Sequence, residues 1–262
     1  MNHRPRKRFG QNFLIDRRVV ADIVAAIAPR PEDHIVEIGP GQGALTAPLL
    51  EKVNLLHAVE LDRDLHAALR ERFPANKLVL HQGDALEFDY ATLPAPLRVV
   101  GNLPYNISTP LLFRLAEFEA RCTDMHFMLQ EEVVERMAAA PSGAAYGRLS
   151  VMLQYRFAIE RLFGVPPESF QPAPRVNSAV VRLRPMPPVE REARGIARDE
   201  RHFARVVTAA FTQRRKTLRN ALAGVIDADG LGKLGIEPGL RPENLSVADF
   251  VAIANVQAGE QL

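Results

Sequence analysis

Four consecutive residues, Asn102, Leu103, Pro104 and Tyr105, carry the most specific chemical signal in the chain. An adenine exocyclic amine is a poor nucleophile because its lone pair is delocalised into the ring. The Asn102 side-chain oxygen and a backbone carbonyl from Leu103 or Pro104 could accept hydrogen bonds from that amine, which favours a pyramidal nitrogen aimed at a methyl group. Tyr105 offers a face for base stacking, worth about 1–3 kcal/mol. The tetrapeptide predicts methylation of an adenine amine; the alternative is a plain turn in which Tyr105 only packs.

A splayed base has a second face, which another aromatic ring could cover. Phe170 stands in a loop stiffened by prolines, residues 167–172, between two late strand-like segments. An exposed phenylalanine held there could complete a stacking sandwich with Tyr105, whereas the competing interpretation is core packing. We therefore include Phe170 among the predicted catalytic residues.

Three earlier apolar runs end in groups that suit a nucleoside ligand. The first ends in a turn with Gly39 and Gly41, where backbone can approach a ligand closely and the next helix offers its N-terminus. Glu60 ends the second run and can accept hydrogen bonds from both ribose hydroxyls. Asp84, after the third, could accept from the amino group of an adenine. This combination favours S-adenosylmethionine; a nicotinamide-dependent oxidoreductase would use the same glycine turn but leaves the Asn102 motif unexplained.

The elements that must position these groups alternate over the first 140 residues. Asp16 is a plausible N-cap of a first helix. Strands are expected at 34–38, 55–60, 78–81, 98–101 and 125–129, with helical patterns between them. Such alternation predicts a parallel sheet covered on both faces, with ligands outside the carboxyl ends of its strands. Strand-like patterns at 152–163 and 177–183 predict an antiparallel pair that finishes the sheet.

The C-terminal part has a different pattern. Prolines and mixed charges at 185–195 indicate a linker. Two apolar stripes at helical spacing follow, over 203–211 and 218–225. The predicted fold class is therefore α/β, with a domain over residues 1–185 that includes a basic N-terminal arm, and a small helical domain over residues 198–262.

The net charge is only +2, but the cations gather in two blocks. Residues 1–18 hold six basic residues against one acidic, and residues 171–220 hold twelve against four, which leaves 15 basic and 26 acidic residues elsewhere. This clustering fits a nucleic-acid partner, whereas the simpler interpretation is two solvated surfaces. No apolar run approaches the roughly 20 residues that span a bilayer, so no membrane is expected. The single cysteine, Cys122, favours a reducing cytoplasm and gives no sign of a zinc site.

The chain resembles the small-subunit ribosomal RNA adenine dimethyltransferase family over nearly its whole length. The likeness is carried by residues 6–14, the glycine turn, and residues 60–62, 102–108, 125–130, 146–150 and 211–216. It implies a Rossmann-like methyltransferase domain with a small C-terminal helical domain. It further implies S-adenosyl-L-methionine-dependent N6,N6-dimethylation of two adjacent adenosines in the 3′-terminal hairpin of 16S rRNA, during small-subunit biogenesis.

The resemblance also implies roles for particular residues. The expected cofactor contacts that it implies are Asn12, Leu14, Gly39, Glu60, Asp84 and Asn102, of which Asn12 and Leu14 rest on the resemblance alone; Gly41 is added from the glycine turn. We expect the rRNA, within the small subunit or its precursor, to dock on Arg214, Arg215, Lys216 and Arg219, assisted by Arg6, Lys7 and Arg8 of the arm. We expect a monomer that needs no metal, because a sulfonium methyl is already electrophilic.

Two further alternatives stay open. A large-subunit rRNA adenine N6-methyltransferase of the antibiotic-resistance type shares the cofactor motifs, although residues 211–220 favour the small-subunit family. A ribosome-assembly factor whose binding matters more than its catalysis is compatible with the same residues, and the sequence does not rank the two roles.

Overall fold

The structure is a computed structural model that describes residues 11–257. Contacts divide this part of the chain into two compact units. The sheet unit contains residues 11–134 and Ile159–Pro185. The helical unit contains Glu135–Ala158 and residues 186–257.

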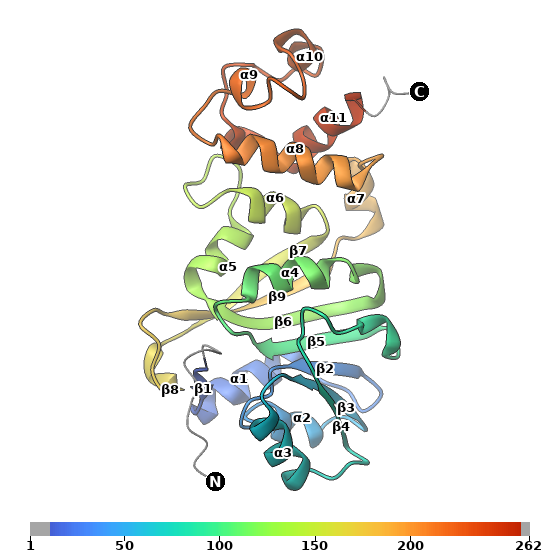
Figure 1. Cartoon of the computed structure of the whole chain (residues 1–262), viewed down its shortest axis with the longest axis vertical. Helices are drawn as coiled ribbons and strands as arrows, with labels where there is room; N and C mark the ends of the chain where they lie inside the picture. The colour runs from blue at the N-terminus through green and yellow to red at the C-terminus, as the bar shows by residue number, and fades with distance from the viewer. Residues whose placement is uncertain (1–10, 258–262) are drawn as a thin grey trace. The chain divides into compact units, whose positions relative to one another are not determined.

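The sheet unit is built on a seven-stranded sheet in the order β4-β3-β2-β5-β6-β9-β7 (Figure 1). Its strands are β2 (His34–Ile38), β3 (Leu56–Glu60), β4 (Leu78–Gln82), β5 (Leu97–Asn102), β6 (Cys122–Gln130), β7 (Phe157–Val165) and β9 (Ser178–Pro185). The pairs β4-β3, β3-β2, β2-β5 and β5-β6 are parallel, as the sequence predicts, and β9 is antiparallel to β6. The strand order reverses between β2 and β5, which is where an open α/β sheet forms a ligand crevice.

Helices and short turns connect these strands. They are α1 (Arg17–Ile27), α2 (Thr46–Leu50), α3 (Arg63–Arg72), η2 (Tyr90–Thr92), α4 (Ser108–Ala116), η3 (Glu119–Arg121), α5 (Glu131–Ala138) and η4 (Pro167–Ser169). The predicted N-cap of α1 is confirmed, because the Asp16 carboxylate accepts from the N–H groups of Arg18 and Val19. Such a side chain satisfies backbone donors that have no partner inside the helix.

Strand β2 shows why the sheet forms where the sequence predicts it. Ile35 and Val36 are fully buried and Ile38 nearly so, as expected of a parallel strand covered on both faces. Burial of each such side chain contributes roughly 1.5–3 kcal/mol. Glu37 interrupts this apolar run and is also buried.

A second, two-stranded sheet joins β1 (Phe13–Leu14) to β8 (Phe170–Gln171). The pairing is antiparallel and sets Leu14 opposite Phe170. The Ile15 N–H also donates to the Ser169 carbonyl at 2.9 Å. The segment before α1 is therefore fixed to the segment that follows β7.

The helical unit contains α6 (Arg148–Gln154), α7 (Pro188–Arg194), α8 (Glu200–Thr212), α9 (Leu218–Ala221), α10 (Ala228–Lys233), η5 (Pro242–Asn244) and α11 (Val247–Gln257). The apolar stripe predicted over 203–211 lies on α8, whose Phe203, Val206 and Val207 are fully buried in one cluster with Phe250. The stripe predicted over 218–225 is helical only as far as Ala221.

The stretch Glu135–Ala158, which the sequence analysis placed in the first domain, makes its contacts inside the helical unit. The reason is that Val151 and Tyr155 pack in the same cluster as Phe203. The strand expected from residue 152 begins only at Phe157, because residues up to Gln154 complete α6.

The linker expected at 185–195 is also partly wrong, because Pro188–Arg194 forms helix α7. A proline is tolerated in the first turn of a helix, where its missing N–H would have no partner anyway. Arg194, in the last turn, donates to the Gln154 carbonyl at 2.9 Å, and Gly195 ends the helix with a φ of 84°.

Candidate functional site

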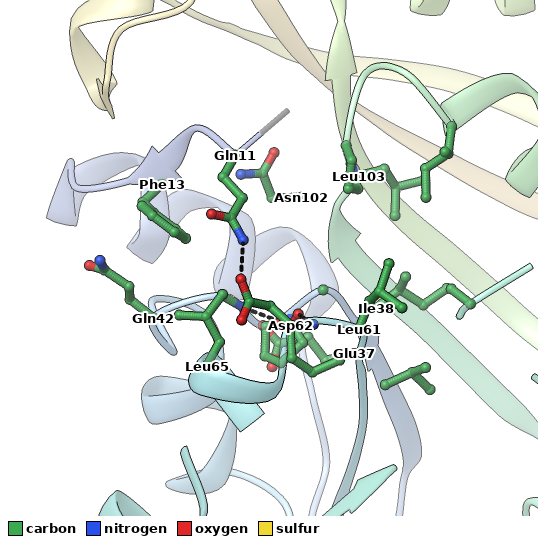
Figure 2. Close-up of a pocket in the computed structure, with 18 of the residues that line it drawn as sticks. Gln11, Phe13, Glu37, Ile38, Gln42, Leu61, Asp62, Leu65, Asn102 and Leu103 are labelled. Atoms are coloured by element: carbon green, nitrogen blue, oxygen red, sulfur yellow. Dashed lines mark hydrogen bonds between the residues drawn. The ribbon is translucent and has the colours of Figure 1, made fainter. Parts of the chain in front are cut away.

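A cavity opens where the carboxyl ends of β2, β3, β4 and β5 meet, and residues 11–14 form another part of its wall (Figure 2). The cavity is lined by every residue predicted to bind the cofactor: Asn12, Leu14, Gly39, Gly41, Glu60, Asp84 and Asn102. Leu103, Pro104 and Tyr105 line it too. The structure therefore brings together ten of the predicted residues: eight that the sequence singled out at separate strand ends, and Asn12 and Leu14, which were expected from the resemblance alone.

The turn after β2 has a backbone that only glycine adopts readily. The φ angles of Gly39, Gly41 and Gly43 are 64°, 58° and 82°, a region that L side chains rarely enter. A Cβ atom on Gly41 would also lie 3.2 Å from the Phe13 ring. Gly39 and Gly41, which line the cavity, thus present backbone without a side chain to it.

Glu60 is held in a fixed position at the end of β3. One carboxylate oxygen accepts from the Asp62 N–H at 2.8 Å, and the other accepts from the Gly41 N–H at 3.2 Å. Its side chain is buried, and this burial raises the pKa of the carboxyl. Each oxygen retains a further lone pair, so a ribose hydroxyl can still donate to it.

Asn102, the last residue of β5, has a defined amide orientation. Its Nδ2 donates to the Asn12 carbonyl at 3.0 Å. Among the described residues, none donates to its Oδ1. The backbone of Asn12 thus fixes the amide so that an acceptor is left for a ligand.

The residues after Asn102 form a tight turn. The Leu103 N–H donates to the Met128 carbonyl at 3.1 Å. The Pro104 carbonyl accepts from the Ile107 N–H at 3.2 Å, whereas within residues 11–257 no donor reaches the Leu103 carbonyl. The sequence left both carbonyls as candidate acceptors, and that of Leu103 is the one without a donor in the described residues.

The segment 11–14 is tied to the strand ends around the cavity. Gln11 donates through Nε2 to the Asp62 carboxylate at 3.2 Å. Figure 2 marks this hydrogen bond by a dashed line. The Asn12 carbonyl accepts from Asn102, and β1 pairs with β8. These contacts place Asn12 and Leu14 at the cavity, where composition and periodicity alone gave no reason to expect them.

A family model described as ribosomal RNA adenine dimethylase matches residues 2–258. The chain belongs to the ribosomal RNA adenine dimethylase family. Proteins named ribosomal RNA small subunit methyltransferase A are 60% identical in Chromobacterium violaceum, over 97% of this chain and 95% of that protein, and in Aromatoleum aromaticum, over 98% and 96%. The sequence-based resemblance is confirmed.

Solved structures share the fold. A dimethyladenosine transferase from Plasmodium falciparum has a TM-score of 0.82 at 22% identity, over 95% of this chain and 98% of that one. The 23S rRNA methyltransferase ErmE has a TM-score of 0.69 at 23% identity, over 93% and 98%. The predicted Rossmann-like fold with a C-terminal helical region is thereby confirmed.

Phe170 is the one predicted catalytic residue that the structure does not bring to the cavity. Its side chain is 3% exposed and packs in a cluster with Leu14, Ile23 and Val165. It is absent from the cavity wall. Phe170 is therefore a core residue, which was the alternative interpretation. Its ring points into the core of the sheet unit because β8 pairs with β1.

The predicted RNA-binding residues of the C-terminal region lie in the helical unit. Arg215 and Lys216 are exposed in the turn between α8 and α9, and Arg219 is exposed on α9. Arg214 is also exposed, but it donates to the Ala144 carbonyl at 2.7 Å and lies 3.9 Å from the Glu243 carboxylate. Arg214 thus also holds the loop after α5, whereas Arg6, Lys7 and Arg8 lie outside the described residues.

Sequence reasoning assigned no role to Glu37, which lines the cavity. Its carboxyl is buried and accepts from the Thr46 hydroxyl at 2.7 Å. The pKa of Glu37 is raised to about 7, chiefly by burial; the nearby Glu60 carboxylate also raises it, and the Thr46 hydrogen bond partly opposes the rise. The sequence signal that could have found Glu37 is a carboxylate inside an otherwise apolar strand. Burial of such a group costs free energy unless it has a hydrogen-bonding partner or a functional role.

Leu61 was also missed. It lines the cavity with 46% of its surface exposed, between the buried carboxylates of Glu60 and Asp62. An apolar side chain that is exposed to solvent beside polar groups can pack against the face of a flat ligand ring. The sequence signal that could have found Leu61 is its position between two acidic residues, directly after a predicted strand.

Two structural findings concern other classes of site. Among residues 11–257, no helix has the length and apolar character needed to cross a membrane. In the same range, no cluster of three or more histidine, cysteine, aspartate or glutamate side chains could hold a metal ion.

Proposed function

We propose that this protein transfers methyl groups from S-adenosylmethionine to the N6 amines of two adjacent adenosines in the 3′-terminal hairpin of small-subunit rRNA. The observation that carries the proposal is the fixed amide of Asn102, whose Oδ1 is left as an acceptor at the cavity. The relatives named small subunit methyltransferase A support the choice of RNA. We further propose that the protein acts as a cytoplasmic monomer.

The cavity fits the methyl donor in three respects. Glu60 offers a carboxylate for ribose hydroxyls, and Leu61 offers an apolar face for the adenine ring. Asp84 accepts from the Leu86 N–H through one oxygen at 2.9 Å, and its other oxygen is available to an adenine amino group. When bound, the donor supplies an electrophilic methyl group on a sulfonium, so the residues of the site need only orient the acceptor.

The acceptor amine would be held by two oxygens. Asn102 Oδ1 and the Leu103 carbonyl both lack a donor among the described residues, and both belong to the turn at the end of β5. Hydrogen bonds from the two amine hydrogens to these oxygens favour a pyramidal nitrogen. Placement of the lone pair in line with the methyl group is the main catalytic contribution, because orientation can supply several kcal/mol of the barrier.

The proton that the amine loses can go to water. Among residues 11–257, no histidine or lysine lines the cavity. The amine becomes acidic as the N–C bond forms and the S–C bond breaks, so a strong base is not needed at that stage. The buried carboxylates Glu37 and Glu60 are already engaged in hydrogen bonds with Thr46 and with backbone N–H groups.

The test is methyl incorporation from labelled S-adenosylmethionine into small subunits that lack the modification, with large subunits as the control. Dimethyladenosine in the small-subunit RNA alone supports the proposal. Label in the large subunit would favour an enzyme of the antibiotic-resistance type. Tight subunit binding without label in either would favour an assembly factor and contradict the site assignments.

A further inference from the structure

Tyr105 is anchored at two points, which is more than a stacking ring requires. Its backbone carbonyl accepts from the Ser108 hydroxyl at 3.1 Å, at the start of α4. Its phenolic oxygen lies 2.7 Å from the Ser178 Oγ, 73 residues further along the chain. The side chain lies between these anchors, at the cavity wall. Rotation of the ring about its Cα–Cβ bond would break the second contact.

Ser178 is itself fixed by the sheet. It is the first residue of β9, is fully buried, and pairs with Gln130 of β6. The carbonyl of the preceding residue, Asn177, accepts from the Glu131 N–H at 3.0 Å. The backbone that carries this hydroxyl is therefore held in place by the sheet, so a hydrogen bond to the hydroxyl can fix the position of another side chain.

The same sheet carries the amide that is proposed to hold the target amine. β6 is the parallel neighbour of β5, and Asn102 pairs with Met128. Asn102 is thus positioned by one side of β6, and the Tyr105 hydroxyl is positioned through β9 on the other side of β6. The two groups that would contact the base are fixed to one rigid frame.

We infer that Ser178 is a positioning residue for methyl transfer: its hydroxyl holds the Tyr105 ring in the orientation that presents a stacked adenine to Asn102. The inference rests on the proposed function, which stacks the target base on Tyr105. Misplacement of a reacting group by about 1 Å can slow a reaction about 10²-fold. Loss of the Ser178 hydroxyl is therefore expected to slow the chemical step more than it weakens RNA binding.

A purely structural role makes a different prediction. If the hydroxyl pair only satisfied two polar groups, its loss would lower stability and leave the rate per folded molecule unchanged. Ser169 provides the matched comparison. It is another buried serine of the sheet unit, and its Oγ donates to the Asp16 carboxylate at 3.3 Å, away from the cavity wall.

The experiment measures single-turnover methylation of unmodified small subunits by wild type, Ser178→Ala, Tyr105→Phe, the double variant and Ser169→Ala. Ser178→Ala and Tyr105→Phe are each expected to slow the step about tenfold with little change in KM, and the double variant should be no slower, because both remove one contact. Additive losses, an equal loss in Ser169→Ala, or a change confined to KM would overturn the inference.

NMR of ring-labelled tyrosine separates this inference from the proposed function. The Tyr105 signal is the one that Tyr105→Phe removes, and it should move in Ser178→Ala but not in Ser169→Ala. An unmoved signal in Ser178→Ala, with wild type active, would overturn the inference alone. A wild-type protein that methylates no small-subunit RNA would overturn the proposed function, and the inference with it.

Discussion

The polar side chains at the two ends of strand β5 differ in how many of their hydrogen-bonding atoms have a partner. At the first end, Arg98 donates to the carboxylates of Asp33 at 2.6 Å and Asp124 at 2.8 and 2.9 Å, and to the Ile27 carbonyl at 2.5 Å. At the last end, Asn102 uses its donor on Asn12 and keeps its acceptor available. At the first end, the charged side chains pair with one another. At the last end, the Asn102 oxygen has no donor among the described residues and can accept a hydrogen bond from a ligand.

We therefore expect residues at the two ends of this six-residue strand to have different roles: the first end stabilises the fold, and the last end serves activity. Changes at Arg98 should alter unfolding without touching the chemistry, and changes at Asn102 should do the reverse. The predictions below test that separation, beginning with the largest expected effect.

Replacement of Arg98 with alanine should be the most destabilising change. It would leave Asp33 and Asp124 without their shared cation, and breaking a buried ion pair in this way costs about 3–5 kcal/mol. Denaturant unfolding would measure the loss, with Arg114→Ala as the control, because the Arg114–Glu117 pair is partly exposed and such pairs contribute less than about 1 kcal/mol. A normal rate per folded molecule is also expected; a large fall in that rate would contradict the separation.

Asn102→Ala should lower turnover about 10²–10³-fold, similar to the loss of one preorganised transition-state hydrogen bond. Cofactor affinity should fall much less, although the change also releases the Asn12 carbonyl. Calorimetric binding and single-turnover rates measure the two effects separately. Asn102→Asp is the companion variant, since it keeps an acceptor and loses the donor to Asn12. Equal losses of affinity and rate in Asn102→Ala would argue against the proposed role.

Glu37→Gln should change how stability depends on pH. The pKa of Glu37 is about 7 in the fold, above its ordinary value of 4.5. The folded state therefore binds the proton more tightly, and stability is lost as pH rises from about 4.5 through 7, by up to about 3 kcal/mol. The glutamine variant should be more stable than wild type at pH 8, and this advantage should shrink towards pH 5.

Urea unfolding without cofactor at these two pH values measures the effect. Glu117→Gln serves as the control because the Glu117 side chain is 62% exposed. An advantage of Glu37→Gln that is equal at both pH values would show that Glu37 ionises normally in the fold.

Simultaneous alanine substitution of Arg215, Lys216 and Arg219 should weaken small-subunit binding and flatten its salt dependence. The log–log slope should fall by about 0.7–0.9 for each phosphate that the variant no longer neutralises. Arg214 is left in place because it holds the Ala144 carbonyl. The control removes three exposed cations of the sheet unit, Arg30, Lys52 and Arg70. An unchanged slope would move the RNA-docking surface elsewhere.

The sequence predicted the strand ends well because each signal was local. An apolar run followed by Gly39, Glu60, Asp84 or Asn102 can be recognised without knowledge of its neighbours, and the parallel sheet then brings these ends to one edge. The same locality explains the predicted N-cap at Asp16.

What the sequence could not supply were contacts between distant segments. The burial of Phe170 depends on the pairing of β8 with β1, and the contact between Tyr105 and Ser178 spans 73 residues. Helix α7 was missed because its prolines and charges resemble those of a linker, although Pro188 stands at a helix position that tolerates proline.

The pairing of β1 with β8 has a consequence for synthesis of the chain. Asp16 and Ser169, which flank this pairing and are joined by a hydrogen bond, are 153 residues apart. At about 5–20 residues per second, a nascent chain elongates for roughly eight to thirty seconds between them. During that interval the wall formed by Asn12 and Leu14 lacks the anchor that β8 provides, so this part of the cavity is completed only when most of the sheet unit has left the ribosome.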